Sequence, residues 1–139
     1  MNNTLYITNF HAGYMEMPEL LTFIQGFSDN NGVDARSSVM IEPKASGKTL
    51  KQLLSEHTRL NAIEIKGKHI NEGKMARVDS CTPTIQSGKV KILKGSWNDA
   101  FILELCTFPN AKHDEAVDCL CYAVYDKFIN GKTIFGITS

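Results

Sequence analysis

Short apolar runs alternate with stretches of helical periodicity along this chain, and the alternation restricts the folds that it can adopt. The runs that predict strands cover residues 4–10, 37–42, 61–66 and 89–93. Helices are predicted at 17–28, 47–57, 73–86, 97–107 and 113–130, where apolar residues recur at three- and four-residue spacing. Strands that alternate with helices are typical of α/β proteins, so we expect a mixed sheet flanked by helices.

The size and composition of the chain predict one globular domain over residues 1–139. The chain has 139 residues, of which 42% are hydrophobic and 22% charged, as in typical globular proteins. No signal peptide is recognisable, and no run approaches the about 18 apolar residues of a membrane span, so we expect no membrane contact. The formal net charge is +0 and gives no global indication of nucleic-acid binding.

The four cysteines are Cys81, Cys106, Cys119 and Cys121. They form no Cys-x-x-Cys pair, and this spacing disfavours a zinc site. Cys106 and Cys121 follow apolar helical patterns, so we expect buried thiols in a reducing compartment.

The segment from Phe108 to Asp118 opens the last predicted helix and carries three acids and a histidine. Asp114 and Asp118 are one helical turn apart, so both carboxylates can project from neighbouring turns near the helix start. The helix dipole favours ionised carboxylates there, and such a pair can hold a divalent metal ion. Glu115 points elsewhere. The alternative is that Asp114 and Glu115 are ordinary first-turn acids that complement the helix dipole.

A further acid, Glu42, follows the apolar run 38–41 at the carboxyl end of a predicted strand. In open α/β sheets ligands bind beyond the carboxyl ends of the strands, so this carboxylate is placed for chemistry rather than for packing. The Gly-Lys-Thr sequence at 47–49 is not a Walker loop, because Glu42 stands where the upstream glycine of that motif is required. ATP binding therefore receives little support.

The order of these elements and acids resembles the nuclease domain of tailed-phage large terminase subunits, which belong to the ribonuclease H-like superfamily. The last of four matching blocks is the most specific, since the family pattern there is Phe-Pro-Asn, a small residue, Lys-His, two acids and a later Val-Asp. The resemblance covers roughly residues 4–128. The four blocks follow the family order and are Tyr14–Leu21, Ile41–Gly47, Ser87–Val90 and Phe108–Asp118.

The resemblance implies a metal-dependent DNA endonuclease that cuts concatenated phage DNA during packaging, with Mg²⁺ or Mn²⁺ held by a cluster of acids. Carried over by position, Glu42 matches the second catalytic acid and Asp114 the last one. Asp118 matches a recurrent acid and is a third candidate metal ligand. His113 is a candidate supporting residue, as is Glu115, which stands where the family usually has aspartate. Two metal ions need several carboxylates, because their charge must be neutralised.

Basic residues near these acids are candidates for contacts with the DNA backbone, namely Lys44, Lys48 and Arg77. The alternatives are a solvated basic face and, for Arg77, a surface salt bridge. The partners that the resemblance implies are double-stranded phage DNA, an upstream ATPase portion of the terminase, the small terminase and the portal. The implied location is the host cytoplasm.

One part of the family pattern is missing from this sequence. The family's first catalytic aspartate lies on an amino-terminal hairpin of two strands, which would precede the strand predicted at 4–10. We therefore expect a partial nuclease domain with an exposed sheet edge, and such an edge favours association into a homodimer. The alternative function is a non-catalytic truncated remnant, or an assembly or DNA-binding module, with the same fold.

Overall fold

A computed structural model describes residues 3–67, 70–110, 113–130 and 134–137. The chain forms two compact units, one from residues 1–12 and 71–132 and the other from residues 13–70 and 133–139. Helices and strands alternate, so the predicted α/β class is confirmed. The described strands form two small parallel sheets and not the one mixed sheet that we expected. The single domain and the missing hairpin stay predictions.

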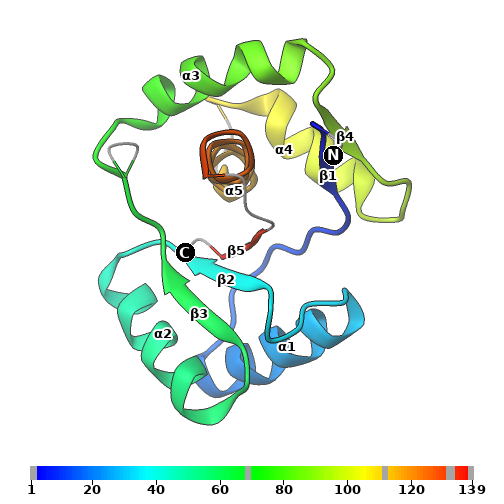
Figure 1. The fold of residues 1–139 in the computed structure, drawn as a ribbon. Helices are drawn as coiled ribbons and strands as arrows, with labels where there is room; N and C mark the ends of the chain where they lie inside the picture. Colours follow the sequence, from blue (N-terminus) through cyan, green and yellow to red (C-terminus); the bar gives the residue numbers. More distant parts are fainter. Residues whose placement is uncertain (1–2, 68–69, 111–112, 131–133, 138–139) are drawn as a thin grey trace. The chain divides into compact units, whose positions relative to one another are not determined.

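The first unit, here called the α5 unit, contains a two-stranded sheet and three α-helices (Figure 1). Strands β1 (Leu5–Ile7) and β4 (Val90–Ile92) pair in parallel. Helices α3 (Lys74–Gln86) and α4 (Asn98–Thr107) both contact α5 (Glu115–Tyr125), and a π-helix, η2 (Asp126–Asn130), continues α5. The predicted helix at 113–130 therefore changes its helical type near its end.

The apolar stripe of α5 forms the core of this unit, as its periodicity predicts. Val117, Leu120, Cys121 and Val124 are buried and pack with Cys81 of α3. The Cys81 and Cys121 sulfur atoms lie 3.1 Å apart, and both residues are free thiols. The hydrogen bond with Cys81 and burial raise the pKa of the Cys121 thiol, so this thiol packs as a neutral group.

The predicted burial of Cys106 is wrong, because this residue is exposed. Phe101 is the buried residue of α4, and Cys106 follows it by five positions. Five residues correspond to a rotation of about 500°, which turns the side chain to a different side of the helix.

The second unit, here called the β2 unit, contains a three-stranded parallel sheet in the order β3-β2-β5. Its strands are β2 (Ser38–Ile41), β3 (Asn61–Glu64) and β5 (Ile134–Ile137), and its helices are α1 (Met17–Asn30) and α2 (Ala45–His57). Both helices lie on the same side of the sheet (Figure 1). The β2-α2-β3 connection is a βαβ unit, which explains the parallel pairing. We did not predict β5.

The hydrophobic core of the β2 unit lies between its sheet and the helices α1 and α2. Val39 and Ile41 of β2 pack with Leu50 and Leu54 of α2 and with Ile24 of α1. Leu54 and Val39 have no exposed surface. These residues hold the carboxyl end of β2 against α2, and Glu42 follows at that end.

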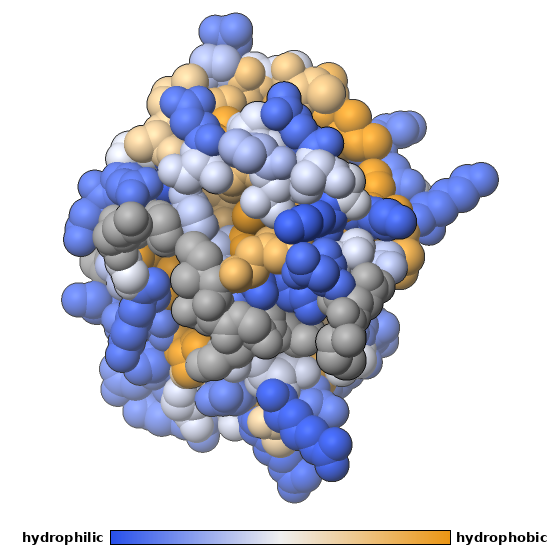
Figure 2. All heavy atoms as spheres, turned by 45° about the horizontal axis from the view of Figure 1, so that its top comes forward, coloured by the Kyte–Doolittle hydropathy of each residue, from blue (hydrophilic) through white to orange (hydrophobic). Residues whose placement is uncertain are grey.

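Large hydrophobic side chains are also exposed on the α5 unit. Figure 2 shows hydrophobic side chains in a band at one edge of a mostly hydrophilic face. The large hydrophobic residues that are exposed on β1, on β4, in the loop after β4 and on α4 are Tyr6, Ile92, Leu93, Ile102 and Leu103. The predicted self-association stays a prediction. No helix in the described part of the chain is long and apolar enough to cross a membrane.

Candidate active site

The start of α5 places Asp114 and Asp118 on neighbouring turns. Asp114 is the residue before the helix, at its N-cap, and Asp118 lies in the first turn. The Asp114 side chain is 32% exposed and the Asp118 side chain only 8%. The two predicted metal ligands of this segment are therefore brought together as their spacing indicates.

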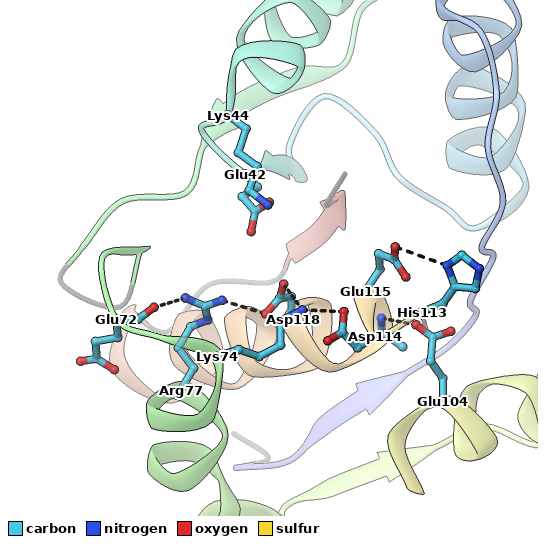
Figure 3. Close-up of polar contacts among 11 residues, drawn as sticks. Glu42, Lys44, Glu72, Lys74, Arg77, Glu104, His113, Asp114, Glu115 and Asp118 are labelled. Atoms are coloured by element: carbon cyan, nitrogen blue, oxygen red, sulfur yellow. Dashed lines mark hydrogen bonds and ion pairs between the residues drawn. The ribbon is translucent and has the colours of Figure 1, made fainter. Parts of the chain in front are cut away.

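Lys74, the first residue of α3, bridges the two carboxylates (Figure 3). Its Nζ atom lies 2.7 Å from Asp114 Oδ1 and 3.0 Å from Asp118 Oδ2. Partial burial by itself lowers the pKa of Lys74, but hydrogen bonds to both aspartates outweigh this effect and raise the pKa above its ordinary value. Lys74 is therefore a charged partner of both acids.

Arg77 occupies the next turn of α3 and pairs with the other oxygen of Asp118. Its Nη2 atom donates to Asp118 Oδ1 at 2.9 Å, and its Nη1 atom donates to the carbonyl of Glu72 at 2.5 Å. The guanidinium carbon lies 5.2 Å from the centre of the Tyr122 ring, which adds a cation–π contact. Arg77 is only 7% exposed. Its predicted contact with DNA stays a prediction.

Glu104 of α4 fixes the first turn of α5. Its Oε1 atom accepts a hydrogen bond from the backbone N–H of Ala116 at 2.8 Å, whereas Asp114 makes no side-chain capping bond. A carboxylate at this position satisfies a helix N–H that would otherwise lack an intrahelical partner, and it complements the positive end of the helix dipole. Glu104 is thus a residue of the site that sequence reasoning missed.

Glu104→Ala is expected to lower the free energy of unfolding by about 1 kcal/mol, because it removes the cap of the helix that carries both aspartates. Urea unfolding followed by circular dichroism measures this change. Glu104→Gln keeps an acceptor oxygen and is expected to lose less. Equal stability of Glu104→Ala and the unchanged chain would show that the cap contributes nothing.

His113 and Glu115 form a separate, more exposed pair. His113 Nδ1 lies 3.9 Å from Glu115 Oε1, and the two side chains are 71% and 44% exposed. Figure 3 shows the Glu115 carboxylate directed toward His113, whereas the Asp114 carboxylate is directed toward Lys74. The supporting roles of both residues stay predictions.

Glu42 belongs to the β2 unit, where it follows the last residue of β2. It is 5% exposed, and its Oε1 atom lies 2.9 Å from Nζ of Lys44, whose side chain is 60% exposed. Lys48 is exposed as well. A buried carboxylate at a strand end agrees with the predicted position of Glu42, while its role as a ligand stays a prediction.

The chemistry of the two α5 acids fits a divalent cation. Asp114 Oδ1 and Asp118 Oδ2 already converge on one cationic group, the Lys74 ammonium. Carboxylate oxygens are the donors that Mg²⁺ and Mn²⁺ prefer. Within the described residues, however, no three His, Cys, Asp or Glu side chains gather in an arrangement that could hold a metal ion.

Comparison with known proteins identifies the family of this chain. A family model described as the terminase RNaseH-like domain matches residues 35–127, more than half of the chain. The matched range includes Glu42, Lys74, Asp114 and Asp118. Searches of curated proteins and of solved structures gave no significant match. The chain therefore belongs to the terminase RNase H-like domain family, as the resemblance in its sequence indicated.

Proposed function

We propose that this chain is a metal-dependent DNA endonuclease domain of a phage packaging terminase and cuts concatemeric DNA by two-metal phosphodiester hydrolysis. The observation that carries the proposal is that the carboxylates of Asp114 and Asp118, at the start of α5, both contact one cationic group, the Lys74 ammonium. Ribonuclease H-like nuclease domains usually use divalent metals, and the family assignment makes a nuclease role the first expectation. The non-catalytic alternative is not favoured by this assignment.

In the proposed site, Asp114 and Asp118 supply carboxylate oxygens to Mg²⁺ or Mn²⁺. A divalent ion, when bound, activates water and stabilises the leaving oxygen of the phosphodiester. Arg77 donates a hydrogen bond to Asp118 Oδ1 and so fixes the orientation of the carboxylate, while the Oδ2 atom is proposed to bind the metal ion. Glu104 fixes the helix start from which both aspartates project. By its match to the family's second catalytic acid alone, Glu42 of the β2 unit is a further proposed metal ligand.

The proposed substrate is double-stranded DNA of a phage, present in the host cytoplasm. Lys44 and Lys48 are exposed cations in the β2 unit and are proposed contacts to the phosphate backbone, where lysine gives affinity without sequence preference. By resemblance, the proposed protein partners are the terminase ATPase portion, the small terminase and the portal. A homodimer is also proposed, and light scattering that finds only monomers at high concentration would contradict it.

Cleavage of supercoiled plasmid in Mn²⁺ or Mg²⁺ tests the proposed activity. We expect nicking by the unchanged chain and a fall to the level of an EDTA control in Asp114→Asn, because this change removes a ligand charge. Asparagine is as good an N-cap residue as aspartate, so the helix start is kept.

Asp79→Asn is the matched control, since Asp79 is an exposed acid on α3 and the change removes the same charge. This variant is expected to cut at the rate of the unchanged chain. Nicking that survives both EDTA and Asp114→Asn would rule out the proposed site. Absence of nicking in every protein would support the non-catalytic alternative.

A further inference from the structure

The position of Lys74 raises a question about how a metal ion enters the proposed site. Its ammonium nitrogen is 2.7 Å and 3.0 Å from the two carboxylate oxygens that converge on it. Mg²⁺ binds carboxylate oxygens at about 2.0–2.1 Å. A divalent ion held by these two carboxylates would need the oxygens that the ammonium group now contacts, so the ion and Lys74 would compete for them.

The two basic residues of α3 differ in their ability to leave. The Arg77 side chain is 8% exposed and is tied to Asp118, to the Glu72 carbonyl and to the Tyr122 ring. The Lys74 side chain is 27% exposed, and a lysine is a single charge on a flexible stem of four carbons. Lys74 can therefore withdraw toward water while Arg77 stays in contact with Asp118.

We propose that Lys74 is an internal counterion that occupies the cation position between Asp114 and Asp118 until a divalent metal ion displaces it. This inference rests on the proposed function, because it takes the two aspartates as metal ligands. Without metal, the ammonium group offsets the repulsion between the two carboxylates and keeps one oxygen of each close to the Lys74 Nζ atom. With metal, the same contacts must be broken, so Lys74 lowers the affinity of the site and acts as a positioning residue.

Metal binding, and not cleavage, tests this inference. Mn²⁺ is titrated into the full chain, and free Mn²⁺ is followed by electron paramagnetic resonance. Lys74→Met keeps much of the side-chain volume and removes the charge, and we expect it to bind Mn²⁺ about tenfold more tightly because two ion pairs no longer compete. The metal-free variant is expected to melt at a lower temperature and to gain more from Mn²⁺ than the unchanged chain does.

Three further variants make the result specific. Lys91→Met removes the same charge from an exposed position of β4 and is expected to leave the affinity unchanged. Lys74→Gln repeats the test with a polar side chain if Lys74→Met does not fold. Lys74→Arg keeps the positive charge and introduces a guanidinium group that can bind a carboxylate through two hydrogen bonds. This variant is therefore expected to bind Mn²⁺ no more tightly than the unchanged chain.

The outcomes separate this inference from the proposed function. Tighter binding by the uncharged Lys74 variants, together with loss of binding in Asp114→Asn, supports the counterion role. Unchanged or weaker binding by those variants overturns it, while the two aspartates remain ligands. Absence of Mn²⁺ binding in all proteins, or binding that Asp114→Asn does not affect, removes the ligand assignment and the inference with it.

Discussion

Replacing Asp118 with alanine is expected to destabilise the protein by about 3–5 kcal/mol, as measured by urea unfolding. The Asp118 and Arg77 side chains are each 8% exposed and lie 2.9 Å apart. Removal of the carboxylate takes one opposite charge away from a buried guanidinium group, and the low exposure keeps solvent from compensating for the loss. The same carboxylate also balances Lys74, so two cations lose a partner at once.

A double variant distinguishes a loss of charge balance from a loss of packing. Asp118→Ala combined with Arg77→Met removes both members of the pair, and it is expected to be more stable than Asp118→Ala alone. Asp79→Ala is the control on the exposed side of α3, with an expected change within about 0.5 kcal/mol. If Asp118→Ala unfolds at the same urea concentration as the unchanged chain, the buried pair has no structural role.

The other large effect is expected at Gly47, in the first turns of α2. A Cβ atom added there would lie 2.1 Å from the Glu42 carbonyl oxygen and 3.1 Å from the Cγ2 atom of Ile41. The carbonyl belongs to the backbone that leaves β2, so it cannot move aside as a flexible side chain could. Gly47→Ala is therefore expected to cost about 3 kcal/mol, although alanine is otherwise the better helix former.

Gly26 provides the matched control for this substitution. It lies inside α1, and an added Cβ would meet no atom within 4 Å. Gly26→Ala is expected to raise the free energy of unfolding by up to about 1 kcal/mol, because only helix propensity and unfolded-state entropy change. Thermal unfolding should thus move in opposite directions for the two variants. A gain in stability for Gly47→Ala would contradict the close approach of α2 to the end of β2.

Local sequence patterns predicted most of the helices and strands, because periodicity depends on neighbours that are close in the chain. The turn spacing of Asp114 and Asp118 likewise sufficed to predict that they lie together. The cations that hold them were not predicted, since Arg77 and Asp118 are 41 positions apart and no local pattern links them. The same limit explains Glu104, whose partner lies on the next helix.

The β2 unit is built from two segments that lie far apart in the sequence, and this separation matters for its folding. Ser38 of β2 aligns with Asn61 on one side and with Ile134 on the other, so the central strand of this sheet pairs with the last described strand. During synthesis, residues 13–70 leave the ribosome early, whereas one edge of β2 stays open until residues 134–137 emerge. A fragment of residues 13–70 would keep that edge open, and open edges pair readily with other chains. We therefore expect β5 to protect the finished chain from aggregation once it has paired with β2, and we expect removal of residues 134–137 to impair solubility during expression.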